Sequence, residues 1–290
     1  MPTQLDLKRR IRSVRNTQQI TRAMKFVAAA RLRRAQERAF AARPYARALS
    51  AVVRSAVTRV PAAAHPLLHR RPEDRVLLLV VSGERGLCGA FNGNVMRRAM
   101  EFLRGRPSQQ GVAVMALGRK GRDALRKQRW TMMAEYVDIA ARSQSARAAE
   151  IAQAVAGRYQ AGEVDAVYIV YNEFKSVLAQ TLTLEKLLPI EPHAPGSAPA
   201  ADEAPVDYLY EQPVGELLAG LLPRYVEAQV FRALAESAAA EHAARMTAMD
   251  SATKNAKELI DKLTLYMNKV RQAAITREII EVVSGAASAG

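Results

Sequence analysis

The sequence predicts an α/β protein: two long terminal helices that form an antiparallel coiled coil, and a central domain built on a mostly parallel sheet. Three observations lead to this prediction. Both ends of the chain contain long stretches without glycine or proline. The last stretch repeats small and apolar residues at heptad spacing, and the middle of the chain alternates Val/Ile/Leu-rich runs with helical segments.

The N-terminal coiled-coil helix is expected over residues 1–58. No glycine precedes Gly83, and no proline lies between Thr3 and Arg43, a stretch that would make a helix of about 60 Å. Its heptad seam comprises Leu7, Ile11, Val14, Gln18, Thr21, Lys25 and Ala28. A seam selected for stability alone would not contain Gln, Thr and Lys, so we interpret the helix pairing here as kept weak or narrow for another purpose. The simpler alternative is that these polar residues are merely tolerated.

The central α/β domain is expected over residues 74–192. Strands are predicted at 75–83, 112–118, 165–174 and 178–190, and helices at 94–103, from 122 onward and at 145–159. Strands that alternate with helices are typical of a parallel sheet covered on both faces. The single tryptophan, Trp130, is assigned to the core of this domain.

A Pro/Ala-rich linker follows over residues 193–207, and the C-terminal coiled-coil helix is expected over 208–286. From Arg224 onward the chain contains no proline. The predicted seam comprises Met249, Ala252, Ala256, Leu259, Leu263, Tyr266, Val270 and Ala273. Since the two helices lie at opposite ends of the chain with a compact domain between them, antiparallel pairing is the simplest way to bury both seams.

Composition limits the functional classes. The chain has 290 residues, 49% of them apolar, which suffices for a real core. The longest apolar run, 76–81, is too short to span a membrane, and residues 1–10 lack a signal-peptide region. We therefore expect a cytoplasmic protein with at most indirect membrane contact. A single cysteine, Cys88, permits no internal disulfide.

The positive charge is concentrated at one end. Residues 1–60 contain 15 Lys and Arg against two acidic residues, which accounts for +13 of the total net charge of +15. A basic segment of this kind is typical of proteins that bind nucleic acid, an anionic membrane surface or an acidic protein partner.

No motif predicts catalysis, a cofactor or a metal site. The turn GERGLCG, 83–89, lacks both the G-x-G start of a dinucleotide site and the Gly-Lys-Ser/Thr end of a P-loop, so a structural turn is favoured. The GRKG sequence at 118–121 resembles the backbone clamp of an RNA-binding KH module, but a plain strand-to-helix connection is favoured. Prolines interrupt the helix that would align His65 with His69. Cys88 is expected to be a buried thiol.

Three stretches together resemble the gamma subunits of bacterial F-type ATP synthases. They are RRIRSVRNTQQITRAMKFVAAARLRRAQ near the N-terminus, SGERGLCGAFN in the middle, and the C-terminal segment that begins ESAAAEHAARMTAMDSATKNAKEL. Members of this family often read Asp-Arg-Gly-Leu-Cys-Gly-Gly in the middle, where this chain has Glu84 and Ala90, so the detail of that turn is open. The cysteine-bearing insertion of chloroplast relatives is absent, and redox control of that kind is not expected.

The resemblance implies a non-catalytic rotor subunit of a proton-translocating enzyme complex. In that family the coiled coil stands inside a ring of three alpha and three beta subunits, and the Rossmann-like central domain meets the epsilon subunit and the ring of c subunits. Rotation driven by ion flow is thereby coupled to ATP synthesis. The implied location is peripheral, on the cytoplasmic side of the bacterial inner membrane, with no nucleic acid bound.

The resemblance also implies two sets of contact residues. Those implied to contact the surrounding ring or to affect coupling are Met24, Lys25, Arg245, Gln272, Thr276, Glu278 and Glu281. Those implied to face the c ring or epsilon are Tyr208, Tyr210 and Glu211.

Two alternatives from other classes remain. A nucleic-acid-binding protein with a basic coiled-coil arm would bind RNA or DNA with a steep salt dependence. An enzyme that uses the central domain for a nucleotide would bind that nucleotide stoichiometrically as an isolated chain.

Overall fold

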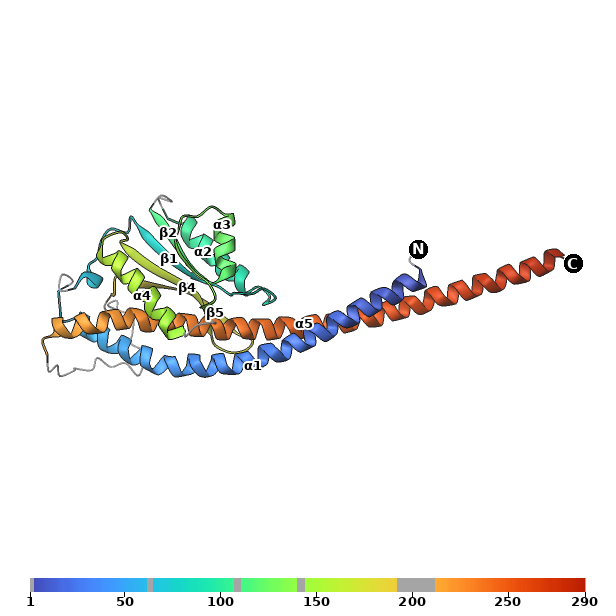
Figure 1. Ribbon diagram of the computed structural model, residues 1–290, viewed down its shortest axis with the longest axis horizontal. Helices are drawn as coiled ribbons and strands as arrows, with labels where there is room; N and C mark the ends of the chain where they lie inside the picture. Colours follow the sequence, from blue (N-terminus) through green and yellow to red (C-terminus); the bar gives the residue numbers. More distant parts are fainter. Residues whose placement is uncertain (1–2, 62–64, 107–110, 140–143, 192–211, 290) are drawn as a thin grey trace. The chain divides into compact units, whose positions relative to one another are not determined.

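The computed structural model describes residues 3–61, 65–106, 111–139, 144–191 and 212–289. They form two compact units: a sheet unit, Ala30–Ala244, and a helix-pair unit, in which Met1–Ala29 lies with Arg245–Gly290. The elements, of which all but η2 and β3 are labelled in Figure 1, are α1 (Gln4–Val57), η2 (Pro66–Leu68), β1 (Val76–Val81), α2 (Phe91–Arg104), β2 (Val112–Leu117), α3 (Arg119–Lys127), β3 (Met132–Tyr136), α4 (Gln144–Gln160), β4 (Ala166–Phe174), β5 (Gln180–Leu188) and α5 (Val214–Ala289). The predicted linker, 193–207, falls outside the described residues.

The sheet has five strands in the order β3-β2-β1-β4-β5. Four strands are parallel, and only β5 is antiparallel, to β4. The central strand β1 is buried along its whole length, which explains its uninterrupted Val/Leu sequence. The predicted α/β class with a mostly parallel sheet is therefore confirmed.

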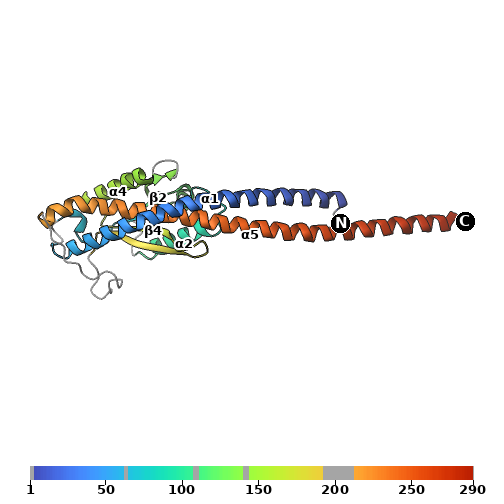
Figure 2. The same ribbon diagram turned by 90° about the horizontal axis from the view of Figure 1, so that it is seen from below.

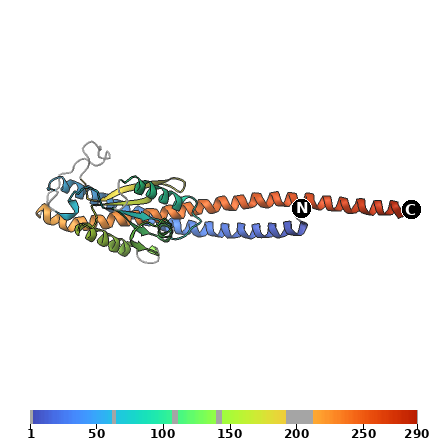
Figure 3. The same cartoon turned by 90° about the horizontal axis from the view of Figure 1, so that it is seen from above.

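Helices cover both faces of the sheet. One face packs against α2 and α3, with Val95, Leu103 and Leu125 in that core. The other face packs against α4 and against the parts of α1 and α5 that belong to the sheet unit, with Ile151, Val53 and Leu222 among its core residues. Figures 1 and 3 show α4 on one side of the strands and α2 with α3 on the other.

The sequence prediction missed strand β3. This strand lies at the edge of the sheet and pairs only with β2, and its residues are half-buried or exposed. An edge strand of this kind has no long apolar run that would indicate it. Trp130, just before it, is half-buried and packs against the α2/α3 core rather than lying inside it.

Both long helices run further than the proline-free stretches. α1 continues through Pro44, and α5 begins at Val214 and continues through Pro223, although each proline removes one backbone hydrogen bond. α1 begins at a reciprocal cap, in which the Thr3 hydroxyl accepts from the Asp6 amide at 3.2 Å and the Asp6 carboxylate accepts from the Thr3 amide at 3.1 Å. Within the described residues, no helix has the length and apolar character needed to cross a membrane.

Candidate functional site

The two chain ends pair with each other in the helix-pair unit. There α1 and α5 lie side by side and run in opposite directions (Figure 2), since Thr21 contacts Thr253 and Lys25 contacts Asp250. The two threonine hydroxyls are 2.9 Å apart, and the Lys25 ammonium donates to the Asp250 carboxylate at 2.6 Å. The predicted antiparallel pairing of the terminal helices is observed in this unit.

Asp250 joins the two helices through charge. Besides Lys25, it contacts Lys254 one turn further along α5, at 3.0 Å. The hydrogen bond from Lys25, followed by that from Lys254, holds the pKa of Asp250 below its usual value. Neither Asp250 nor Thr253 belongs to a motif that would predict its role. A lysine in an antiparallel seam does, however, need an acidic or polar residue opposite it.

The α1 seam agrees with the heptad prediction. Each predicted seam residue is buried or half-buried, whereas most neighbouring residues on α1 are exposed. The buried members are Leu7, Ile11, Thr21 and Ala28, and the half-buried members are Val14, Gln18 and Lys25. The small Thr and Ala side chains let the helices approach closely, and the polar seam is therefore a real contact surface.

The α5 seam agrees at five of its eight positions. Met249 and Ala256 are buried and Ala252, Leu263 and Val270 are half-buried, but Leu259 and Tyr266 are each 42% exposed, and Ala273 is exposed. In a pair of helices with nothing else packed against it, the partner helix covers each seam residue on one side, and the other side stays open to solvent. Because the helices are antiparallel and Lys25 faces Asp250, the first residue of α1, Gln4, lies level with Arg271 on α5. Ala273 therefore lies beyond the start of α1.

Among the residues that the structure describes, none covers the end of α5. Figure 2 shows it continuing past the N-terminus of α1, and every residue from Arg271 to Ser284 is exposed. Several of these are large and apolar: Ile275, Ile279, Ile280, Val282 and Val283. Contiguous exposed apolar side chains of this kind mark an interaction surface.

The implied ring-contact residues fall in two groups. Gln272, Thr276, Glu278 and Glu281 are all exposed on the uncovered end of α5. Met24, Lys25 and Arg245 belong instead to the paired region, where Met24 and Lys25 are half-buried and Arg245 is only 8% exposed. The residues implied to face the c ring, Tyr208, Tyr210 and Glu211, lie outside the described residues.

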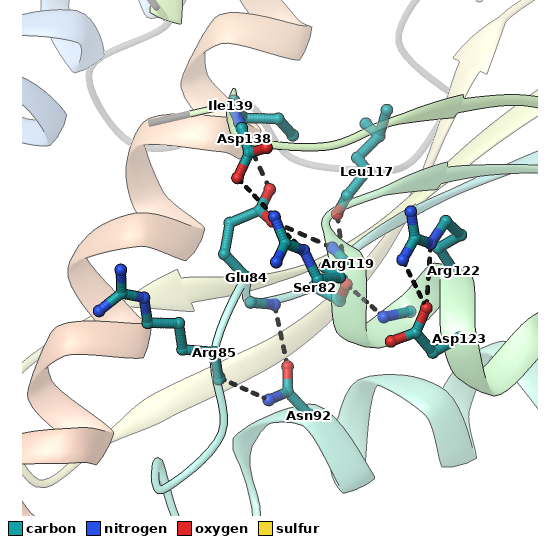
Figure 4. A network of polar contacts seen from close by, with 12 residues as sticks. Ser82, Glu84, Arg85, Asn92, Leu117, Arg119, Arg122, Asp123, Asp138 and Ile139 are labelled. Atoms are coloured by element: carbon teal, nitrogen blue, oxygen red, sulfur yellow. Dashed lines mark hydrogen bonds and ion pairs between the residues drawn. The ribbon is translucent and has the colours of Figure 1, made fainter. Parts of the chain in front are cut away.

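The glycine turn after β1 serves as the N-terminal cap of α3 (Figure 4). The Arg119 amide donates to the Glu84 carboxylate at 3.4 Å, and the Gly121 amide donates to the Ser82 hydroxyl at 2.7 Å. Between them, the Lys120 amide donates to the Gly83 carbonyl at 3.1 Å. The free N–H groups at a helix start are what a phosphate would bind, and here the chain's own oxygens occupy them.

Glu84 also reaches the loop after β3. It accepts from the Ile139 amide at 3.3 Å, and Arg119 in turn donates to Asp138 at 2.8 Å (Figure 4). The carboxylate thus ties three loops together at one edge of the sheet, a structural role that fits the structural-turn interpretation. Cys88, in the same turn, is buried, as expected. Among the residues that the structure describes, no group of three His, Cys, Asp or Glu side chains could hold a metal.

Comparison with known sequences gives full-length matches. A family model described as ATP synthase matches residues 3–289. The ATP synthase gamma chain of Solibacter usitatus is 53% identical over 293 residues, which cover 100% of both chains. The ATP synthase gamma chain of Trichlorobacter lovleyi is 46% identical over 283 residues, 97% of each.

Comparison with solved structures shows the same fold. A chain from the central stalk and c ring of the Tetrahymena thermophila mitochondrial ATP synthase aligns with a TM-score of 0.63 and 23% identity, over 80% of this chain and 99% of that one. A chain from the Euglena gracilis mitochondrial ATP synthase aligns with a TM-score of 0.67 and 19% identity, over 97% and 93%.

Proposed function

The chain belongs to the ATP synthase gamma-chain family, and we therefore propose that its paired terminal helices turn inside a ring of three alpha and three beta subunits. Rotation driven by proton flow through the membrane sector is coupled in this way to ATP synthesis in the ring. The chain itself carries out no bond chemistry.

The physical requirement is asymmetry. A rotor biases each surrounding catalytic subunit only if it contacts the ring differently on its different sides, because equal contacts shift no equilibrium. Moving a two-state site from mostly open to mostly closed takes about 5.5 kcal/mol of differential contact free energy. A turn of the rotor then passes each conformation on to the next catalytic subunit.

The observation that carries the proposal is the two-sided character of the uncovered end of α5. At about 100° per residue, the five exposed apolar side chains of this segment fall within about 160° of arc. The apolar side comprises Ile275, Ile279, Ile280, Val282 and Val283, and the opposite side carries Arg277, Glu278 and Glu281. A neighbour therefore meets either an apolar or a charged surface, depending on the angle of rotation.

Individual contacts follow from exposure. Gln272, Thr276, Glu278 and Glu281 are free to reach the ring directly, and a hydrogen bond to a charged group there contributes about 1.5–3 kcal/mol. Lys25 is already engaged with Asp250, so its part in coupling includes setting the register of the two helices. Arg245, with little exposed surface, is proposed to present only part of its guanidinium to the ring.

The remaining partners belong to the other part of the complex. We assign the epsilon subunit and the c ring to the sheet unit and to the segment that contains Tyr208, Tyr210 and Glu211. We propose that the chain is a peripheral subunit of this complex, on the cytoplasmic side of the bacterial inner membrane. The full-length similarity to ATP synthase gamma chains supports this assignment.

Reconstitution tests the function. The chain, mixed with alpha and beta subunits, should form a complex that contains one copy of it with three of each partner, has ATPase activity and rotates a probe attached to this chain. Failure to assemble would contradict the proposal. Tight, steeply salt-dependent binding of the isolated chain to RNA or DNA would instead favour the nucleic-acid alternative.

A further inference from the structure

Three elements of the sheet unit meet at one carboxylate, that of Glu236 on α5. Arg43 on α1 holds it with two hydrogen bonds, from Nε to Oε1 at 2.6 Å and from Nη2 to Oε2 at 2.9 Å. The backbone of Phe174, the last residue of β4, completes the group. Its amide donates to Glu236 Oε2 at 3.0 Å, and its carbonyl accepts from Arg43 Nη2 at 2.5 Å. We call Arg43, Glu236 and the Phe174 backbone the clasp.

The clasp is shielded from water. The Glu236 side chain is 2% exposed and that of Arg43 22%. The ring of Phe40, one turn before Arg43 on α1, covers the guanidinium at 4.8 Å and lies 6.2 Å from the ring of Phe174. Charged hydrogen bonds in such a site are short, directional and little weakened by solvent.

The clasp lies where open α/β sheets usually bind a ligand. The strand order turns back between β1 and β4, and the carboxyl ends of strands at that point form the customary binding crevice. Here α5 crosses both strand ends: Glu236 binds Phe174 at the end of β4, and the Glu241 carboxyl lies so close to Gly83, after β1, that a Cβ there would come within 2.9 Å of it. The position where a ligand would bind is therefore taken by Glu236 and Glu241, two carboxylates of α5 itself.

A second tie lies one turn away on the same side of α5. Arg232 donates to the Glu185 carboxylate on β5 at 2.6 Å, and the Tyr171 hydroxyl on β4 donates to the other oxygen of Glu185 at 3.1 Å. This tie joins α5 to the sheet but does not include α1. The clasp, in contrast, joins both long helices to a strand.

From this arrangement we propose that the clasp is the torque-bearing joint of the chain: it locks α1, α5 and the sheet together so that they turn as one body. The proposal rests on the proposed rotor function. Apolar packing alone permits small slips of a helix about its axis or along it, whereas a two-pronged Arg–carboxylate pair fixed to a strand end tolerates neither.

Stability alone does not explain a buried ion pair at this position. Replacing such a pair by apolar residues of similar volume is often neutral or stabilising, while removing one partner is strongly destabilising. The charged pair is therefore best understood as a device for fixed geometry. This difference makes the proposal testable apart from folding.

The test measures torsional stiffness in the assembled complex. The ring is immobilised and catalysis is stopped. A nanorod is then attached to the sheet unit through the substitution Leu178→Cys, in the exposed turn between β4 and β5. The natural Cys88 is buried and should not react with the rod. We expect Glu236→Gln to broaden the thermal distribution of rod angles. In membrane vesicles, the same variant should lose proton-driven ATP synthesis while retaining ATP hydrolysis.

Two further variants make the result specific. Glu37→Gln breaks a solvent-exposed pair with Arg33 within α1 alone and should leave the angular distribution unchanged. The double variant Arg43→Leu/Glu236→Leu keeps the site apolar and folded, and we expect it to regain the wild-type melting temperature but to keep the broadened distribution. This variant decides the matter if Glu236→Gln does not assemble.

The outcomes separate the two proposals. An unchanged angular width in either folded clasp variant would overturn the clasp as a torque joint and leave the rotor function intact. A wild-type chain that does not rotate inside the ring would overturn the rotor function itself.

Discussion

The ammonium group of Lys25 lies 2.6 Å from the carboxylate of Asp250, although 225 positions separate the two residues in the sequence. This contact sets the register of the two helices in the helix-pair unit. It also places Arg271 level with the start of α1, so that the following turns of α5 are left uncovered.

Reversing the charge at Lys25 should loosen the paired ends. In Lys25→Glu two carboxylates face each other across the helices, and we expect hydrogen exchange of the backbone amides around Asp250 to accelerate severalfold. Lys25→Ala should have a smaller effect, because both partners are partly exposed and solvent screens the pair. Lys254→Glu, which brings the same charge near Asp250 from within α5, is the matched control and should not separate the helices.

Acid should weaken the sheet unit through Glu73. Burial raises the pKa of Glu73, but hydrogen bonds from Lys186, Arg106 and Tyr168 outweigh it and lower the pKa to about 2, from an ordinary value of 4.5. Because the pKa is lower in the folded state, the stabilisation is fully present above pH 4.5 and is lost as the pH falls toward 2.

Glu73→Gln should therefore reduce the loss of unfolding free energy that occurs as the pH falls below 4.5. After a discount for solvent screening, we expect it to remove about 1–2 kcal/mol of unfolding free energy at pH 7 and much less near pH 2.5. Urea unfolding at both pH values measures this. Glu101→Gln, at an exposed carboxylate on α2, controls for the change in net charge, and equal losses in both variants would refute the assignment.

Two glycine-to-alanine substitutions should have opposite effects. Gly118 has φ of 112°, and a Cβ there would lie 2.2 Å from the Ser82 carbonyl oxygen, so Gly118→Ala should cost about 2–4 kcal/mol of stability. Gly93 lies in the first turn of α2, and a Cβ there would meet no atom within 4 Å outside its own helical turn. Gly93→Ala should raise stability by about 0.5–1 kcal/mol, because alanine is the better helix former. Thermal unfolding of both variants would show the two signs.

A charge on the apolar side of the α5 end should separate folding from assembly. Ile279 is well exposed, so Ile279→Asp should change the stability of the isolated chain by less than about 0.5 kcal/mol. Because we propose that this apolar side of α5 contacts the ring, a charge placed on it should disturb that contact, and we expect ATP synthesis in the complex to fall. Arg277→Gln, on the opposite side of the helix, serves for comparison. Equal effects of the two substitutions would argue against a two-sided surface.

Combined replacement of Gln272 and Arg245 should impair coupled ATP synthesis while the sheet unit stays folded. Circular dichroism and thermal unfolding monitor the fold, which matters because Arg245 is nearly buried. The single variant Gln272→Ala, at an exposed position, shows which part of the loss comes from direct contact with the ring. Wild-type coupling in the double variant would remove both residues from the proposed mechanism.

Much of the fold could be predicted because its signals are local. The buried run of β1, the heptad seam of α1 and the glycine-free ends each leave a pattern within a few dozen residues. Strand β3 escaped prediction because an edge strand is only partly buried and lacks such a pattern. The exposure of Leu259 and Tyr266 was also missed, since spacing shows which residues share a helix face but not how much of that face a partner covers.

The two helices, the α/β class and the family follow from the sequence, because propensity, periodicity and long shared motifs are properties of neighbouring residues. The contacts of Asp250 with Lys25, and of Glu236 with Arg43 at the end of β4, became known from the folded structure. An ion pair between residues about two hundred positions apart, 225 and 193 in these cases, depends on how the folded elements pack, and nothing in either local segment specifies its partner.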